Sequence, residues 1–240
     1  MFLYKKKIIV TGGSGRFGKE LKKIKTNYQF LFPSKKKLNI LRVESIKKYL
    51  KIQKPKYLIH LAGLSRPMDI HEKSINKSID LNIIGTANIT KVCSDLGIKL
   101  IYFSTSYVYP GMKGSYNEND PMLPKNNYSW SKLGGESSVQ MYKNSLVLRV
   151  CMTEKPFIHK KAFYDFITNF IYHEDIAKNL IKLINKKGVI NVGGKTQSVY
   201  KFAKKYNKNI KKISAKKILG PKYPLNPSMN ITKYKKIIKK

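Results

Sequence analysis

Cysteine is scarce in this chain of 240 residues. Cys93 and Cys151 are its only cysteines, and they are far too distant in sequence to form a CxxC pair. The scarcity excludes a fold stapled by disulfides and argues against a zinc site. We therefore expect a protein of a reducing compartment, the cytoplasm, without a bound metal.

Long apolar runs are also missing. No stretch approaches the roughly 18 apolar residues of a membrane span, and Lys5, Lys6 and Lys7 stand where a signal peptide would place its apolar core. We therefore expect neither membrane insertion nor secretion. Apolar residues still make up 42% of the chain, which is enough for a self-sufficient core in one large domain, with or without an appendage.

Acidic residues are few. The chain has 13 Asp and Glu against 49 Lys and Arg, a net charge of +36, and such a balance alone would indicate nucleic acid as partner. Only four of the basic residues are Arg, whereas recognition of phosphates and bases favours the forked guanidinium. Because the lysines are spread over nearly every expected element, we interpret the charge as solvated surface and do not expect nucleic acid as the main partner.

The first half of the chain alternates short β-branched runs with longer amphipathic stretches, which is typical of parallel βαβ units. The expected strands are Lys7–Val10, Gln29–Phe32, Tyr57–Leu61, Leu100–Phe103 and Leu146–Val150. The expected helices are Phe17–Ile24, Val43–Lys51, Asn76–Leu96 and Tyr128–Tyr142. The strands are almost continuously apolar, as strands are when helices cover both faces of a sheet. The pattern predicts an α/β fold, a doubly wound parallel (Rossmann) sheet.

The pattern loosens after Val150. Residues 154–170 show no clear strand. Further along, the sequence predicts a helix over His173–Ile184, a strand at Val189–Val192, a helix over Ser198–Tyr206, a loop at Gly220–Pro227 and a frayed end at Tyr234–Lys240.

A glycine motif follows the first expected strand. Gly12, Gly15 and Gly18 have the GxxGxxG spacing at the turn into the first helix. Glycines there let the backbone approach a pyrophosphate, while the N-terminus of the helix supplies N–H donors and a partial positive charge. The motif predicts a dinucleotide-binding domain over residues 1–150. We expect residues 151–240 to form a smaller, substrate-binding region.

The choice between NAD and NADP depends on the end of the second strand, where an acidic residue would bind the ribose 2′-OH of NAD. No Asp or Glu occurs between Glu20 and Glu44, and Pro33–Lys37 contains three lysines instead. Arg16 lies inside the glycine turn itself. Positive groups at both places favour the 2′-phosphate of NADP, and NAD stays the alternative.

Tyr128 and Lys132 are four residues apart, on one face of an expected helix. A neighbouring ammonium lowers the pKa of a phenol, so the tyrosine can exchange a proton with a carbonyl or an alcohol near neutral pH. Upstream, the strand ending at Phe103 delivers the hydroxyls of Ser104, Thr105 and Ser106 to the carboxyl edge of the sheet, where ligands bind in open parallel sheets.

Together these motifs resemble the extended short-chain dehydrogenases/reductases, and within them the dTDP-4-dehydrorhamnose reductases. The resemblance rests on the glycine turn, Leu61-Ala62-Gly63, Asn82, the loop Ser104–Gly111, the run Tyr116–Pro121, and Tyr128–Lys132 followed by Leu133–Glu136.

The resemblance implies a role for each matching residue. Thr105 would polarise the substrate oxygen, Tyr128 would donate or accept the proton, and Lys132 would lower the pKa of the tyrosine and bind the nicotinamide ribose. Asn82 would hold the geometry of the central helix. The implied cofactor-binding residues are Gly12, Gly15, Arg16, Phe17, Gly18, Leu61, Ala62, Gly63, Ser104, Tyr128 and Lys132. The implied substrate-binding residues are Ser65, Ser106 and Tyr107.

The expected reaction is the NADP-dependent reduction of a nucleotide-linked 4-keto-6-deoxy sugar. Relatives that dehydrate sugars carry an Asp-Glu pair where this chain has Ser106 and Tyr107, and relatives that resemble fucose synthases have a cysteine in this loop, which this chain lacks. A 4-epimerase that retains NAD and a non-catalytic dinucleotide-binding protein stay open as alternative functions. The sequence also leaves open whether the chain forms a homodimer. We interpret Cys151, His60 and His173 as structural residues.

Overall fold

A six-stranded sheet forms the centre of the fold. The computed structural model describes residues 5–220 and 223–239. The sheet has the order β10 (Gly188–Val192), β5 (Ser145–Val150), β4 (Lys99–Thr105), β3 (Tyr57–His60), β1 (Lys7–Thr11) and β2 (Gln29–Leu31). The strands from β2 to β4 pair in parallel registers. The predicted Rossmann-type sheet is therefore confirmed, and each of its first five strands lies within two residues of its expected bounds.

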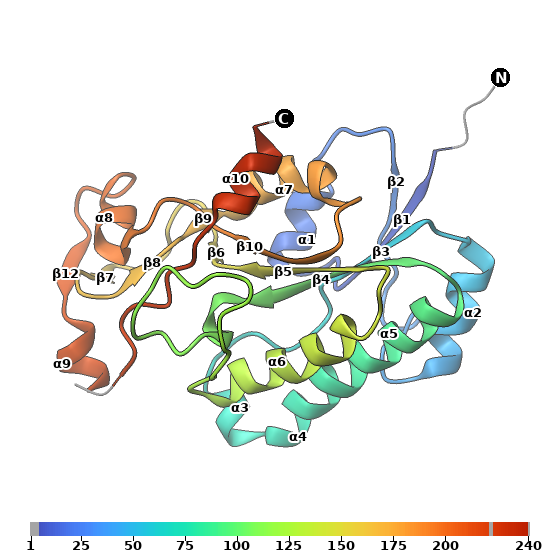
Figure 1. Cartoon of the computed structure of the whole chain (residues 1–240), viewed down its shortest axis with the longest axis horizontal. Helices are drawn as coiled ribbons and strands as arrows, with labels where there is room; N and C mark the ends of the chain where they lie inside the picture. Colours follow the sequence, from blue (N-terminus) through green and yellow to red (C-terminus); the bar gives the residue numbers. More distant parts are fainter. Residues whose placement is uncertain (1–4, 221–222, 240) are drawn as a thin grey trace. The chain divides into compact units, whose positions relative to one another are not determined.

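Helices flank the sheet on both faces. Figure 1 shows α2 (Val43–Gln53), α5 (Gly85–Asp95) and α6 (Asn127–Gln140) along one face, with α1 (Arg16–Leu21) on the other. The short α3 (Ile70–Lys73) was not expected from the sequence. These helices close a core in which Ile9, Ile46, Leu58, Ile89 and Leu100 are almost wholly buried.

The predicted helix over Asn76–Leu96 is present but interrupted. It begins as α4 (Ile75–Ser78), passes through a π-helical segment at Ile79–Ile84, and continues as α5. Such wide turns are rare and lie frequently at functional sites. The amphipathic period of the sequence does not distinguish a π turn from an α turn, so this feature could not be predicted.

The described chain divides into two compact units. Unit 1 comprises the described residues up to Ser104 with Asn126–Leu148 and Ile184–Val189, and unit 2 comprises Thr105–Lys125, Arg149–Leu183 and the described residues from Ile190 onward. The units are interleaved along the chain. The predicted assignment of cofactor binding to residues 1–150 and substrate binding to residues 151–240 stays a prediction.

Unit 2 is built from short elements. They are a 3₁₀ turn (Ser106–Val108), β6 (Met152–Thr153), β7 (Lys161–Phe163), β8 (Ile167–Thr168), β9 (Ile171–Tyr172), α7 (His173–Leu183), β11 (Gln197–Ser198), α8 (Val199–Lys204), β12 (Lys211–Ile213), α9 (Ala215–Leu219) and α10 (Thr232–Ile238). The strands pair as β6–β9, β7–β12 and β8–β11. Aromatic and aliphatic side chains, among them Phe166, Tyr172 and Phe202, form its core.

Two predictions about unit 2 are wrong. Residues 154–170 contain β7 and β8, which at two or three residues are too short to show a period. The end predicted to fray at Tyr234–Lys240 contains most of α10, because Tyr234 is buried and its hydroxyl contacts the Asn179 amide at 3.4 Å. Residue 240, and residues 221 and 222 of the predicted loop Gly220–Pro227, lie outside the described residues. Among the described helices, none is both long and apolar enough to cross a membrane.

Helix α6 packs unusually close to the π-helical segment through two glycines. A Cβ at Gly135 would collide with the Asn82 main-chain oxygen and lie 2.9 Å from the Tyr102 hydroxyl. A Cβ at Gly134 would meet the end of the Ile83 side chain at 2.9 Å. The first neighbour is fixed backbone, whereas the second is a side chain that can rotate.

We expect Gly135→Ala to lower the free energy of unfolding by about 2 kcal/mol, because the helix must move away from Asn82. Gly134→Ala is the matched control. There the Ile83 side chain can yield, and the better helix propensity of alanine, worth about 1 kcal/mol, offsets the contact. Urea unfolding of both variants checks the difference, and equal effects would contradict it.

Candidate functional site

The glycine turn after β1 has room for backbone alone. Gly12 has a φ of +68°, and a Cβ there would lie 2.6 Å from the Ala62 main-chain nitrogen. A Cβ at Gly18 would lie 2.6 Å from the Gly13 Cα. The turn is closed by the Gly15 N–H, which donates to the Gly12 carbonyl at 3.0 Å. The positive φ and the two close approaches explain why glycine is required at Gly12 and Gly18.

The N-terminus of α1 has no side-chain cap. Gly15, which has no side chain, occupies the N-cap position, and Arg16 begins the helix with an exposed side chain. The first N–H groups of a helix lack partners within it and attract anions. Phe17 follows, but its ring is buried and lies 4.9 Å from that of Phe103, so its side chain belongs to the core.

The sheet register gathers the other predicted cofactor residues of unit 1 at the same edge. Thr11 pairs with His60, and His60 pairs with Tyr102. The turns after β1 and β3 therefore lie at the carboxyl edge of the sheet, and Ser104, near the end of β4, lies at the same edge. The Thr11 hydroxyl accepts from the Leu61 and Ala62 N–H groups at 3.2 Å each, which fixes the second turn beside the first.

The edge has the features of a dinucleotide site. Ser104 is 2% exposed, and within the described residues its hydroxyl has no hydrogen-bond partner. A buried polar atom of this kind is costly unless a ligand or water satisfies it. The bare glycine backbone, the helix terminus without a side-chain cap and this hydroxyl fit a pyrophosphate and its attached nucleoside. Ser65, predicted to face the sugar, is exposed on the loop after β3.

Tyr128 and Lys132 lie one turn apart on α6, in unit 1. The Asn126 side chain caps this helix by accepting from the Ser129 N–H at 2.9 Å. Tyr128 is half-buried, and the His71 ring contacts its ring edge to face with centroids 5.1 Å apart. His71 is held in turn by a 2.6 Å hydrogen bond between its Nδ1 and the Ser78 hydroxyl. The short α3 thus supplies a wall for Tyr128.

The Lys132 ammonium is drawn inward. Its Nζ lies 4.2 Å from the centroid of the buried Tyr102 ring. Desolvation lowers the pKa of Lys132 to about 7, and the charge of Glu136, one turn further along α6, opposes this shift. An aromatic face and a buried carboxylate are the groups that stabilise an ammonium away from water.

Asn82 joins three parts of unit 1. Its carboxamide oxygen accepts from the Leu64 N–H at 2.7 Å, and its nitrogen donates to the Leu64 carbonyl at 2.9 Å and to the Ser131 hydroxyl at 2.8 Å. Ser131 lies between Tyr128 and Lys132, and its own hydroxyl donates to the Tyr128 carbonyl at 2.8 Å. The π-helical segment therefore presents an amide that ties the loop after β3 to α6. Gly63 leaves space for it, since a Cβ there would lie 2.7 Å from the Asn82 oxygen.

Thr105, Ser106 and Tyr107 belong to unit 2, at the end of β4 and in the 3₁₀ turn. The Thr105 hydroxyl accepts from the Tyr107 N–H at 3.3 Å and so caps the turn. Ser106 is 1% exposed, and Tyr107 is half-buried against the aromatic core of unit 2. The three residues predicted to act on the substrate thus lie together, at the end of β4 and in this turn.

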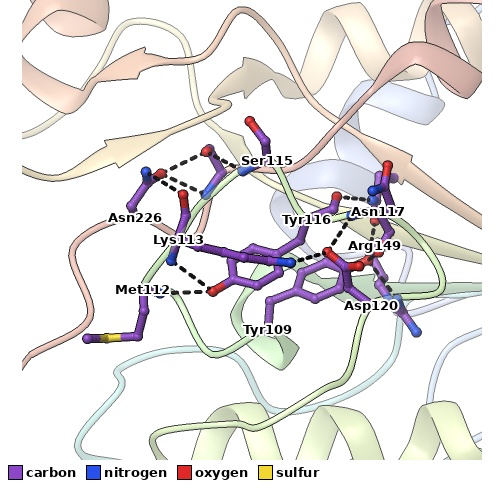
Figure 2. A network of polar contacts seen from close by, with 11 residues as sticks. Tyr109, Met112, Lys113, Ser115, Tyr116, Asn117, Asp120, Arg149 and Asn226 are labelled. Atoms are coloured by element: carbon purple, nitrogen blue, oxygen red, sulfur yellow. Dashed lines mark hydrogen bonds and ion pairs between the residues drawn. The ribbon is translucent and has the colours of Figure 1, made fainter.

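A network around Arg149 supports the segment that follows this turn (Figure 2). The buried guanidinium of Arg149 donates to the Tyr109 hydroxyl at 2.7 Å and to the Glu118 carbonyl at 2.9 Å. The Tyr109 and Tyr116 rings stack with centroids 4.9 Å apart, and the Tyr116 hydroxyl accepts from the Met112 N–H at 2.9 Å. The family-like run Tyr116–Pro121 is therefore a support for the loop.

Both cysteines are buried thiols. Cys93 and Cys151 are free and buried, and burial raises the pKa of both thiols. Cys151 Sγ lies 2.9 Å from the Thr168 hydroxyl. A buried protonated thiol is a poor nucleophile, as expected for a structural residue.

His60 was interpreted as a structural histidine, and its surroundings confirm this. It is 1% exposed, its Nδ1 lies 2.7 Å from the Thr11 hydroxyl, and its Nε2 lies 3.1 Å from the Thr86 hydroxyl. Burial and the Lys132 charge lower its pKa to about 3. His173 begins α7, again as expected. Sequence reasoning missed Tyr102, although a tyrosine in a strand covered on both faces must find a partner for its hydroxyl.

The Rossmann-type sheet, the glycine turn after β1 and the Tyr-Lys pair on α6 define the class of extended short-chain dehydrogenases/reductases. A sequence model described as the RmlD substrate binding domain matches residues 6–178. The chain belongs to this family, and the predicted resemblance to dTDP-4-dehydrorhamnose reductases is confirmed.

Solved structures agree with this placement. The fold is similar to that of dTDP-4-dehydrorhamnose reductase from Bacillus anthracis in complex with NADP, with a TM-score of 0.86, 24% identity, and coverage of 98% of this chain and 92% of that one. For the dTDP-4-dehydrorhamnose reductase from Yersinia enterocolitica the TM-score is 0.78, with 26% identity over 93% and 89% of the two chains.

The subunit beta of methionine adenosyltransferase 2 from Xenopus laevis is 33% identical over 155 residues, which are 60% of this chain and 46% of that protein. The chain spans about half the length of the curated relatives it matches.

The low pKa of His60 leads to a prediction about how the free energy of unfolding depends on pH. An unfolded histidine has a pKa of about 6.5, so between about pH 3 and 6.5 the unfolded state binds the extra proton and the folded state does not. Stability therefore rises with pH across this window, and it falls as the solution is acidified. We expect the difference in free energy of unfolding between the protein and a His60→Gln variant, which cannot titrate, to narrow as pH falls from 6.5 to 4.

Urea unfolding at several pH values measures this difference. His159→Gln, at an exposed histidine, is the matched control. A difference that stays constant over the window would contradict the assignment.

Proposed function

We propose that this protein catalyses the NADP-dependent reduction of a nucleotide-linked 4-keto-6-deoxy sugar. The observation that carries the proposal is the pairing, within one unit, of a bare glycine turn with a Tyr128–Lys132 pair whose ammonium is partly desolvated. Membership of the family supports a nucleotide-linked sugar as the substrate class. Incubation with NADPH and dTDP-linked 4-keto-6-deoxy sugars, with identification of the product, tests it.

The chain's residues would act by positioning and by proton transfer. When bound, the nicotinamide supplies a hydride to the sugar carbonyl carbon. Tyr128 donates the proton that the carbonyl oxygen requires, and Lys132 lowers the pKa of that phenol and binds the nicotinamide ribose. The Thr105 hydroxyl polarises the same oxygen. Ser65, Ser106 and Tyr107 contact the sugar, and the hydroxyls of Ser106 and Tyr107 cannot provide the acid and base that water elimination needs.

The preference for NADP over NAD is part of the proposal. Arg16 is exposed at the first position of α1, and Lys35, Lys36 and Lys37 are exposed after β2. The solved relatives were obtained with either cofactor, NADP for the Bacillus anthracis reductase and NAD for the Bordetella bronchiseptica enzyme WbmG. The cations favour the additional phosphate.

We expect Arg16→Ala to weaken NADPH binding about tenfold more than NADH binding, because one charge-assisted hydrogen bond to phosphate is lost. Fluorescence titration of both nucleotides measures the dissociation constants. Lys19→Ala, at an exposed lysine on the same helix, should change the two affinities equally. If Arg16→Ala also changed them equally, the assignment of Arg16 would be wrong.

A second candidate function is a dinucleotide-binding subunit without turnover. It is favoured by the similarity to the subunit beta of methionine adenosyltransferase 2, whose name describes a component of another enzyme. The two functions differ in one measurement. A non-catalytic subunit would bind NADPH but would not oxidise it with any 4-keto sugar nucleotide, whereas a retained NAD and an interconversion at C4 would indicate an epimerase.

We expect Tyr128→Phe to abolish sugar reduction and to leave the NADPH dissociation constant within a few-fold of the parent value, because only the proton donor is removed. Stopped assays of product and fluorescence titration measure the two quantities. Tyr142→Phe is the matched control, since the Tyr142 hydroxyl bonds to the main-chain carbonyls of Cys93 and Ile98 and to the Asn144 side chain, none of which is a predicted site residue. Activity that survives in Tyr128→Phe would remove Tyr128 from the mechanism.

A further inference from the structure

A line of buried polar side chains crosses the core of unit 1. It comprises Thr11 at the end of β1, His60 at the end of β3, Thr86 in α5, Tyr102 in β4 and the Lys132 carbonyl in α6. The four side chains are each 2% exposed or less. Buried polar groups are expensive unless each is satisfied, so the order of donors and acceptors along this line can be worked out.

The order begins at Thr11. Its hydroxyl oxygen accepts from the Leu61 and Ala62 N–H groups, so its own proton remains for His60 Nδ1 at 2.7 Å. Nδ1 is then an acceptor, and in a neutral imidazole the proton must reside on Nε2. Nε2–H therefore donates to the Thr86 hydroxyl at 3.1 Å.

The same reasoning continues from Thr86 to α6. Having accepted from His60, the Thr86 hydroxyl directs its proton to the Tyr102 oxygen, with which it forms a side-chain hydrogen bond. The Tyr102 O–H then donates to the Lys132 carbonyl at 3.1 Å. Each bond fixes the direction of the next, and Gly135 lets α6 come close enough for the last one, since a Cβ there would lie 2.9 Å from the Tyr102 hydroxyl.

We propose that His60 is a positioning residue, whose neutral imidazole carries a one-way line of hydrogen bonds from the turn after β3 to the main chain of Lys132. The line joins the strand that precedes the glycine turn to the helix that bears Tyr128 and Lys132. It also holds the Tyr102 ring beneath the Lys132 ammonium, 4.2 Å from Nζ. Its catalytic consequence rests on the proposed function, whereas the line itself does not.

The imidazole must stay neutral for this role. A second proton on Nδ1 would face the Thr11 hydroxyl proton, and the line would reverse or break. Among charged or titratable groups, Lys132 on α6 acts on the imidazole, and the Tyr102 ring on β4 lies 5.9 Å from it, centroid to centroid. Glu136 on α6 acts on Lys132 and Tyr102. Burial and, after it, the Lys132 charge oppose a second cation in the core and lower the pKa of His60 to about 3.

Nitrogen NMR of histidine-labelled protein tests the line directly. His60 is assigned among the four histidines by the resonance that His60→Gln removes. We expect the Nε2–H tautomer, unchanged from pH 5 to 8, and loss of the slowly exchanging Nε2 proton in Thr86→Val. An Nδ1–H tautomer, or a protonated ring in this range, would overturn the proposal.

Kinetics then test the positioning role. Thr86→Val keeps the side-chain volume, and Tyr102→Phe keeps the ring beneath Lys132. We expect each to lower kcat about tenfold through misplacement of α6, and the double variant to lose no more than the larger single loss. Independent structural effects would instead multiply to about a hundredfold, and that result would overturn the role.

Thr90→Val is the matched control. Thr90 lies one turn after Thr86 on α5, and its hydroxyl donates to the Thr86 carbonyl at 2.9 Å, outside the line. It should change kcat less than twofold. If the parent protein reduces no sugar, the proposed function fails on its own. The NMR result and the NADPH affinities then decide the inference. We expect Thr86→Val and Tyr102→Phe to weaken NADPH binding to the same extent, and the double variant to weaken it no further.

Discussion

The close approach of two backbone turns, after β1 and after β3, is the constraint on which the rest of unit 1 depends. Gly12 and Ala62 are so close that a side chain at Gly12 has no space, and the Thr11 hydroxyl takes the two N–H groups of the second turn. Parallel strands bring their carboxyl ends to one edge. The contact converts that edge into a surface of bare backbone, which is what a pyrophosphate needs.

The same strands also carry polar groups into the core of unit 1. His60 and Tyr102 lie in strands that are buried along their whole length, and their neighbours Leu58, Ile59, Leu100 and Ile101 are apolar. Their hydrogen bonds run toward α5 and α6, so satisfying them also fixes where those helices lie. The π-helical segment contributes in the same way, because the wide turn lets the Asn82 amide bridge Leu64 and Ser131. The hydrogen bonds that satisfy these buried polar groups therefore also fix the position of Tyr128.

The sequence predicted what depends on local pattern. The strands and the glycine turn were recognised because apolar runs and glycine spacing report directly on a buried parallel sheet. The Tyr128–Lys132 pair was recognised by its spacing on a helix. What could not be predicted depends on partners far away in the chain. The π turn at Ile79–Ile84 has the composition of a helix, α10 forms because Tyr234 is buried, and the position of Tyr102 depends on Thr86 and on Gly135.

The high positive charge of the chain explains why the position of Glu136 matters for Lys132. In a protein with 13 acids and a net charge of +36, the general field disfavours any further buried cation. Lys132 is nonetheless held against Tyr102, with its pKa lowered to about 7 by desolvation. Glu136 is wholly buried one turn away and raises the pKa of Lys132 against that effect. Near neutral pH Lys132 is therefore close to balance between the ammonium and the neutral amine. A bound anion at this edge of the sheet would favour the ammonium. The local carboxylate and the incoming ligand act in the same direction, which is how a lysine inside a strongly basic protein can remain a cation where the proposed chemistry needs one.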